Sequence, residues 1–146
     1  AQLRKCFAKL WGLDDLSDAS TQEVVSHAKA NPHLYVLKPQ REGGGNNVYD
    51  EELAERLGRA EGNGLSAYIL MQRILSPTHR AHVLRNGECS EADTLSELGI
   101  YGIYLSDNGR EIINRCSGAL VRTKLASSNE GGVTAGYSCL STPYLT

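Results

Sequence analysis

The chain has 146 residues, of which 22% are charged and 40% hydrophobic, so its composition predicts a soluble globular protein rather than a disordered or membrane-spanning one. Its length fits one domain or part of one domain. Fifteen basic and 17 acidic residues give a formal charge of -2, which argues against binding to duplex nucleic acid, where many phosphates must be neutralised.

Apolar side chains at helical spacing predict a helix at the start of the chain: Leu3, Cys6, Phe7 and Leu10. Because the chain lacks an initiator Met and begins directly in this pattern, we expect it to be a piece of a longer protein.

A second helix is expected to begin at a capping box formed by Ser20 and Glu23, in which each side chain satisfies a backbone N–H group of the other residue. Its buried residues would be Val24, Val25 and Ala28, and Pro32 would end it. Residues 34–37 then form a predicted buried strand. Residues 38–47 are poor in apolar side chains and rich in Pro, Gly and Asn, which predicts a loop.

The second half of the chain is mostly strand-like. After a short helix that starts with acids at Asp50, strands are predicted at 68–71, 81–84 and 98–105. A hairpin turn at 107–109 returns the chain through residues 112–113. Residues 120–124 alternate apolar and basic, so Arg122 and Lys124 should project from one face. These elements predict an α+β fold with a mostly antiparallel sheet.

The glycine-rich loop carries the most informative chemistry. Three consecutive glycines expose backbone N–H groups and permit a close approach to a ligand, as a phosphate site requires. A cation, a carboxylate and an amide flank them, and these are parts of a nucleotide-magnesium site. From chemistry alone, a phosphate site and a solvated glycine turn remain equal alternatives. The candidate residues are Lys38, Pro39, Gln40, Arg41, Glu42, Gly43, Gly44, Gly45, Asn46 and Asn47.

A second set of candidates lies toward the C-terminus. Glu97 is a carboxylate at the start of an apolar strand, where a ribose hydroxyl, a metal ion or simply water could satisfy it. Arg122 and Lys124 suit an anionic ligand, although a solvated strand face is the ordinary alternative. Residues 130–136 are glycine-rich and form either a cover over a ligand or a plain connection.

The sequence of residues 35–49 closely resembles the glycine-rich segment of eukaryotic glutathione synthetases. The resemblance continues in order through residues 68–74, 96–99, 122–124 and 131–133 and ends at Tyr144, so it covers nearly the whole chain. It implies an ATP-grasp architecture for residues 1–146, as the C-terminal portion of a longer enzyme. The sequence departs from the residues usual in this family at Gln72, Arg73 and Thr134.

The resemblance also implies roles. Lys38 would contact phosphate, Gly43, Gly44 and Gly45 would cover it, and Glu42 would bind magnesium. The other nucleotide contacts implied are Asn47, Tyr49, Met71, Gln72, Arg73, Ile74, Glu97, Lys124 and Glu130. Arg122, with the backbones of Val133 and Thr134, would bind the peptide substrate. Lys38 and Arg122 are the residues expected to act on the reacting groups.

The implied reaction is the ATP-dependent joining of γ-glutamylcysteine to glycine through an acyl phosphate, with Mg²⁺ required. In the family, further magnesium ligands and most of the peptide pocket precede this region, so we expect the chain alone to be incomplete for catalysis. Two alternatives remain: a non-catalytic nucleotide-binding or structural relative, and an unrelated phosphate-binding module. The resemblance further suggests a homodimer in the cytoplasm or a plastid.

Overall fold

The computed structural model describes residues 2–41, 45–59, 64–85 and 87–142, which belong to two compact units, one from Ala1 to Leu75 and one from Ser76 to Thr146. Each unit contains a four-stranded sheet in which every paired strand is antiparallel. Among the described residues, no helix is long and apolar enough to cross a membrane.

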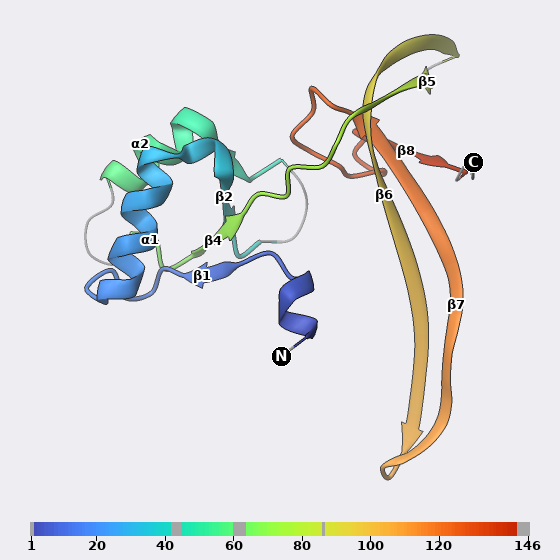
Figure 1. Cartoon of the computed structure of the whole chain (residues 1–146), viewed down its shortest axis with the longest axis horizontal. Coiled ribbons are helices and arrows are strands. Elements are labelled where there is room, and N and C mark those ends of the chain that lie inside the picture. Colours follow the sequence, from blue (N-terminus) through green and yellow to red (C-terminus); the bar gives the residue numbers. More distant parts are fainter. Residues whose placement is uncertain (1, 42–44, 60–63, 86, 143–146) are drawn as a thin grey trace. The chain divides into compact units, whose positions relative to one another are not determined.

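The first unit combines the sheet order β1-β4-β2-β3 with two α-helices (Figure 1). Its strands are β1 (Leu10–Gly12), β2 (Tyr35–Pro39), β3 (Val48–Tyr49) and β4 (Tyr68–Gln72). Its helices are α1 (Ala19–Ala30) and α2 (Asp50–Arg59), with short 3-10 helices at Leu3–Cys6 and Pro32–Leu34.

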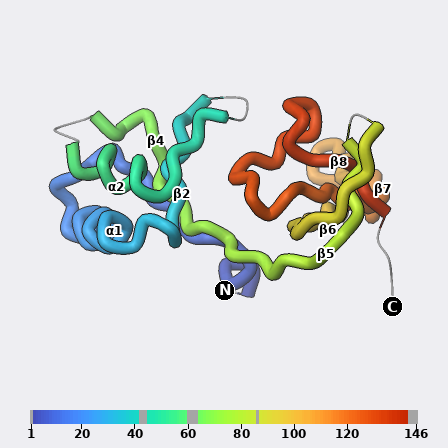
Figure 2. The backbone as a smooth tube through the Cα atoms, turned by 90° about the horizontal axis from the view of Figure 1, so that it is seen from above, coloured from blue at the N-terminus to red at the C-terminus, as the bar shows by residue number. Residues whose placement is uncertain are grey.

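The core of the first unit lies between the helices and one face of the sheet. One row of paired residues crosses all four strands, so its side chains share that face: Trp11, Leu70, Leu37 and Val48. Leu37 and Leu70 are fully buried, as is Leu53 of α2. Figure 2 shows α1 and α2 side by side against the strands. The other face of the sheet is not covered by these helices.

The start of α1 corrects the expected capping box. The cap is Asp18, whose carboxylate accepts hydrogen bonds from the Thr21 backbone N–H, at 2.9 Å, and from the Ser20 hydroxyl. These bonds hold the pKa of Asp18 below its ordinary value, with the Ser20 hydroxyl as the largest cause. Because the helix begins at Ala19, Asp18 holds the N-cap position and its carboxylate reaches the Thr21 N–H group, whereas Ser20 already lies inside the first turn. Val24 and Ala28 are buried, as predicted, whereas Val25 is only partly buried.

Helix α2 agrees with its prediction. Leu53 and Leu57, one turn apart, are buried against the sheet. The opposite side carries the ion pairs Glu52–Arg56 and Glu55–Arg59, at 3.2 and 3.0 Å, at the spacing that brings helical side chains together.

Two further predictions about the first unit were wrong. Only Leu3–Cys6 is helical at the start, and Leu10 belongs to a strand because it pairs with Met71, 61 positions later. Strand β2 also continues through Lys38 and Pro39, which were placed in the loop. Pro39 is the last residue of the strand, where its missing N–H group is tolerated.

The second unit consists of β5 (His79–Arg85), β6 (Glu88–Asp107), β7 (Arg110–Leu125) and β8 (Ser138–Ser141), in that order across the sheet. Asn108 and Gly109 form the predicted hairpin turn, with φ angles of 46° and 80° that suit the tight turns of hairpins. Strands β6 and β7 are longer than predicted, and Figure 1 shows them as a ribbon that extends beyond β5 and β8.

One face of the second sheet is tied by a row of polar side chains. The Ser96 hydroxyl lies 3.3 Å from His79 Nε2 and 2.8 Å from Thr123 Oγ1, and the Ser141 hydroxyl donates to Thr123 Oγ1 at 2.7 Å. Thr123 is buried. This row joins all four strands, so it braces the sheet behind the face that carries Arg122 and Lys124.

Candidate functional site

The face of the first sheet that lies away from α1 and α2, called the open face below, brings several predicted site residues together. Leu10, Met71, Val36 and Tyr49 are paired neighbours across β1, β4, β2 and β3, so they form one row on the face away from the helices. Lys38 pairs with Ile69 and lies on the same face, two residues from Val36. An apolar row beside a cation is what a flat base with a charged phosphate tail requires.

The glycine-rich loop is described only at its ends. The Gln40 backbone N–H donates to the Ala67 carbonyl at 2.8 Å, which fixes the exit from β2. Gly45 has a φ angle of +86°, which favours glycine, and nothing lies within 4 Å of where a Cβ would stand. Arg41 and Asn46 are exposed. Glu42, Gly43 and Gly44 lie outside the described residues, so the expected approach of Lys38 and Glu42 stays a prediction.

Four side chains meet beside the apolar row. The Asn47 amide donates to the Tyr49 hydroxyl at 3.3 Å, and the Arg73 guanidinium lies 5.5 Å from the centre of the Tyr49 ring. Arg73 Nη1 also donates to the Asp50 carboxylate at 3.2 Å. Three of these residues were nucleotide candidates. Asp50 was noted only as an acid that starts a helix, and no signal in the sequence connects it with Arg73.

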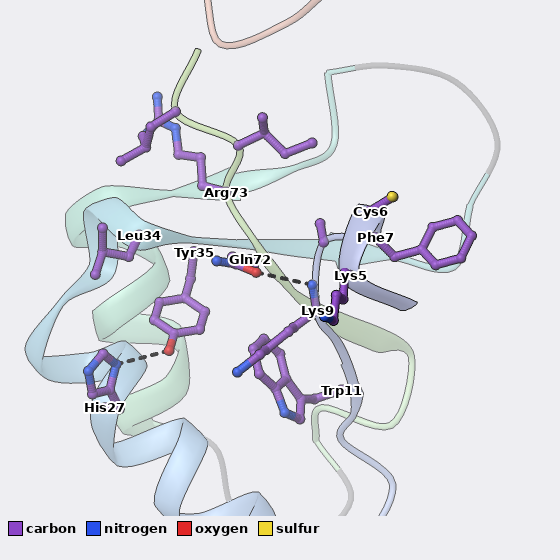
Figure 3. A pocket seen from close by; sticks show the side chains of 13 residues that line it. Lys5, Cys6, Phe7, Lys9, Trp11, His27, Leu34, Tyr35, Gln72 and Arg73 are labelled. Carbon is purple, nitrogen blue, oxygen red and sulfur yellow. Dashed lines mark hydrogen bonds between the residues drawn. The ribbon is translucent and has the colours of Figure 1, made fainter. Parts of the chain in front are cut away.

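The segment expected to line the base pocket divides between the two faces of the sheet. Gln72 is one residue beyond Met71, so its side chain lies on the other side, where its Oε1 accepts from the Lys9 backbone N–H at 3.2 Å. There it borders a cavity of about 590 Å³ with Trp11 and Tyr35 (Figure 3). Ile74 is 75% exposed and lines the same cavity.

This cavity is aromatic in character. The rings of Trp11 and Tyr35 lie 5.8 Å apart, and the Tyr35 hydroxyl is 2.9 Å from His27 Nδ1 (Figure 3). It borders the helix-covered side of the sheet and contains neither Lys38 nor Met71. The nucleotide candidates Lys38, Met71 and Tyr49 therefore belong to a different surface from Gln72.

In the second unit, Glu97 and Arg122 are opposite each other in the pairing of β6 with β7. Arg122 Nε donates to Glu97 Oε2 at 3.0 Å, and Nη2 of the same guanidinium also donates to this oxygen. The predicted alternation is confirmed, because Val121 and Thr123 are buried while Arg122 and Lys124 lie on the other face.

The loop after β7 folds back over these cations. Lys124 Nζ donates to the carbonyls of Ser128 and Asn129 at 2.8 and 3.2 Å. The Ser138 hydroxyl donates to the Gly131 carbonyl at 2.8 Å. A Cβ placed on Gly131 would lie 3.9 Å from Lys124 and 4.0 Å from Arg122, at ordinary contact distance, so the loop backbone lies beside both cations.

A cavity of about 430 Å³ lies at this place, lined by Glu97, Tyr101, Arg122, Val133 and Thr134 among others. Its polar end is the Glu97–Arg122 pair, and its other walls include backbone and apolar groups. The structure therefore brings together the predicted ribose and peptide-substrate residues of the second unit. Glu130 is adjacent to the loop contacts of Lys124, since its carbonyl accepts from the Ser128 hydroxyl at 2.9 Å.

No cluster of metal ligands is present in the described parts of the chain, where no three histidine, cysteine, aspartate or glutamate side chains lie close enough to hold an ion. Glu42, the one nominated ligand, is outside those parts. The expected role of Glu42 as a magnesium ligand therefore stays a prediction.

Comparison with known proteins agrees with the resemblance noted in the sequence. The family model "Eukaryotic glutathione synthase, ATP binding domain" matches residues 1–145. The chain is 48% identical to a chloroplastic glutathione synthetase of Arabidopsis thaliana and 41% identical to glutathione synthetase of Bos taurus. Each alignment covers 99% of this chain, but only 26% and 30% of the respective relative.

A solved structure with a similar fold is that of a glutathione synthetase-like effector from Globodera pallida in its apo form. Its TM-score is 0.67 at 24% identity, and the match covers 99% of this chain and 29% of the effector. The fold is thus the α+β, ATP-grasp type predicted from the sequence, and the family model that matches the chain is that of an ATP-binding domain. The chain belongs to the eukaryotic glutathione synthase family, as the resemblance indicated.

Proposed function

We propose that the protein is an ATP-dependent ligase that joins γ-glutamylcysteine to glycine, and that this chain supplies nucleotide-binding residues. The chain spans 26% to 30% of the length of the two relatives described above. The observation that carries the proposal is the open face of the first sheet, where the row Leu10–Met71–Val36–Tyr49 lies beside Lys38. The base would lie along the row, and the phosphates would extend toward Lys38.

The chemistry needs an activated carboxylate, because a carboxylate loses oxide only with great difficulty. A carboxylate oxygen of γ-glutamylcysteine attacks the γ-phosphorus of ATP, the bond to the bridging oxygen breaks, and ADP leaves. The glycine nitrogen then attacks the acyl carbon, loses its proton and displaces inorganic phosphate. Lys38 would neutralise charge on the transferred phosphoryl group, a contribution that arises from a fixed charge already in position.

In the second unit, Arg122 would bind a carboxylate of the peptide substrate, since its guanidinium already binds the carboxylate of Glu97. The backbones of Val133 and Thr134 would line the pocket for the amino acid that is added, because both residues border the cavity at Arg122. Lys124 and Glu130 would contribute to nucleotide binding, and Glu97 would accept from a ribose hydroxyl. Closure of the loop after β7 would exclude water from the acyl phosphate.

Mg²⁺ would accompany ATP, because a hard cation bound by phosphate oxygens and one or two carboxylates suits this chemistry. Glu42 is the proposed ligand in this chain, and the remaining glycine-loop contacts would come from Pro39, Gln40, Gly43 and Gly44. We further propose a homodimer of the full-length enzyme without a nucleic-acid or membrane partner, located in the cytoplasm. A plastid is the alternative location, since two of the relatives are chloroplastic enzymes.

Calorimetry and a turnover assay on the full-length protein test the proposal. Mg-ATP should bind, and phosphate should be released only when γ-glutamylcysteine and glycine are both present. The chain of 146 residues by itself should not catalyse the reaction. ATP binding without turnover by the full-length protein would instead identify a non-catalytic nucleotide-binding relative, and absence of ATP binding would exclude the proposal.

A further inference from the structure

An aromatic side chain, that of Tyr101, borders the cavity at Arg122 in addition to the residues that the family resemblance nominated. Tyr101 lies on β6, four residues beyond Glu97. Because strand residues two apart share a face, Glu97, Gly99 and Tyr101 all lie on the side of the sheet that carries Arg122. Tyr101 is therefore placed where it can contact a molecule that Arg122 binds.

The ring of Tyr101 lies along its own strand, over Gly99. A Cβ placed on Gly99 would be 3.2 Å from Cε2 of Tyr101 and 3.5 Å from its hydroxyl oxygen. The ring thus takes the space that a side chain at residue 99 would need, which is a reason for glycine inside this strand. Since Gly99 lies between Tyr101 and Glu97, the hydroxyl end of the ring is directed toward the Glu97–Arg122 pair.

A bulge in the pairing of β6 with β7 lies beside Tyr101. Tyr101 pairs with Gly118 and the next residue, Gly102, pairs with Cys116, so Ser117 is an extra residue on β7. Bulges increase the local twist and change the direction of neighbouring side chains, and they are frequent next to active sites. Gly118 has no side chain that could hold the ring across the strands, so the ring is able to lie along β6.

The hydroxyl of Tyr101 suits a carboxylate bound at Arg122. Tyr101 is 55% exposed, so a bound molecule can reach it. A carboxylate has two oxygens with about four sites that accept hydrogen bonds, and two parallel bonds from a guanidinium fill only two of them. A phenolic hydroxyl beside the guanidinium can donate to one of the remaining sites.

We infer that Tyr101 is a further substrate-binding residue: its hydroxyl donates a hydrogen bond to the carboxylate of γ-glutamylcysteine that Arg122 binds, and its ring forms an apolar wall of the same cavity. The inference deepens the proposed function and rests on it, because it presumes that the peptide substrate binds at Arg122. Gly99 has a supporting part, since the absence of a side chain there lets the ring take this position.

The test uses two pairs of variants in the full-length protein. Tyr101→Phe removes the hydroxyl but keeps the ring over Gly99. Tyr104→Phe is its matched control, because Tyr104 is 65% exposed and lies three residues further along β6, on the opposite face. Gly99→Ala displaces the ring with a methyl group. Gly102→Ala is the control for that change, since the nearest atom to a Cβ there is 3.9 Å away.

Steady-state kinetics with each substrate varied in turn gives the readout. Tyr101→Phe should raise the KM for γ-glutamylcysteine roughly fivefold to tenfold, as expected for one hydrogen bond in a hydrated cavity, and leave kcat and the KM for ATP unchanged. Gly99→Ala should raise the same KM, and both controls should behave as the wild type. In an Arg122→Ala background, Tyr101→Phe should change this KM by roughly twofold or less, because residues that hold the same group are not additive.

A KM for γ-glutamylcysteine that is the same in Tyr101→Phe and Tyr104→Phe would overturn the inference alone, as long as the wild type joins the two substrates. An undiminished effect of Tyr101→Phe in the Arg122→Ala background would also overturn it, because the hydroxyl would then act away from that carboxylate. If Gly99→Ala does not fold, the two tyrosine variants still decide. Failure of the wild type to join γ-glutamylcysteine to glycine would overturn the proposed function and the inference with it.

Discussion

Arg122 and Glu97 face each other across β6 and β7, with Arg122 Nε 3.0 Å from Glu97 Oε2. Their side chains are 40% and 65% exposed, so the pair is well hydrated. Exposed ion pairs contribute about 0.2–1 kcal/mol. A substrate carboxylate that offers both oxygens to the guanidinium could therefore take the place of Glu97 at small cost, and the pair would hold Arg122 ready for it.

Arg122→Ala should raise the KM for γ-glutamylcysteine by roughly tenfold or more, because hydrogen bonds to charged groups contribute about 1.5–3 kcal/mol. Arg122→Lys should recover part of this loss, since an ammonium keeps the charge but cannot form two parallel bonds. Steady-state kinetics with each substrate varied in turn measures both effects. Arg115→Ala, on the same strand away from the cavity, is the control. An equal rise in the KM for ATP would contradict the role given to Arg122.

Lys38→Gln should weaken ATP binding by roughly tenfold or more, because a charge-assisted bond to phosphate is lost. Binding of adenosine, which has no phosphates, should change little. Calorimetry with both ligands measures the difference, and Lys29→Gln on α1 is a control that removes an exposed lysine from the helix side. If adenosine and ATP lose affinity equally, Lys38 supports the fold of the face rather than the phosphates.

The sequence predicted those elements that a pattern of neighbouring residues specifies. Leu53 and Leu57 define the buried side of α2, and the turn at Asn108 and Gly109 requires the positive φ angles that these residue types adopt. The short strands β1, β3 and β8 were not predicted. Three residues such as Leu10–Gly12 carry too little pattern, and they are extended because β4 pairs with them from far along the chain.

The same distinction applies to the candidate site, where some placements follow from one strand and others from the pairing of distant strands. Alternation along one strand was enough to place Arg122 and Lys124 on one face. The row across four strands, the opposite placement of Gln72 and Met71, and the Asp50–Arg73 pair all depend on register between distant segments. Resemblance to a family supplied the expected roles, but it contained no information about which of these side chains share a surface.

Lys124→Met should loosen the loop at residues 126–137, because Lys124 Nζ holds the carbonyls of Ser128 and Asn129. Within that loop, the Gly136 and Tyr137 backbone N–H groups donate to Val133 and Gly132 at 3.0 and 2.9 Å. Their hydrogen exchange, followed by mass spectrometry, should become faster in the variant while exchange in β7 stays unchanged. Unaltered exchange at both amides would show that the lysine is not what holds the loop.

The cap of α1 predicts a dependence of stability on pH. Hydrogen bonds from the Ser20 hydroxyl and the Thr21 N–H lower the pKa of Asp18 in the folded protein below its ordinary value of 3.8. The ionised carboxylate therefore stabilises the fold fully above that value, and this contribution is lost as the pH falls through the lower, folded pKa. The pKa of Asp15 is lowered too, with the hydrogen bond from the Ser17 hydroxyl as the largest cause. The pH dependence of wild-type stability therefore does not by itself isolate the contribution of Asp18.

Asp18→Asn isolates it, because an amide oxygen can still accept hydrogen bonds but carries no charge and does not titrate. The variant should melt at a lower temperature than the wild type at pH 7, and the difference should shrink as the pH is lowered below 3.8 and Asp18 becomes neutral. Glu23→Gln is the informative comparison, since the expected capping box would make Glu23 the residue that matters. A pH-dependent loss of stability in Glu23→Gln, with none in Asp18→Asn, would restore the capping box and remove Asp18 as the cap.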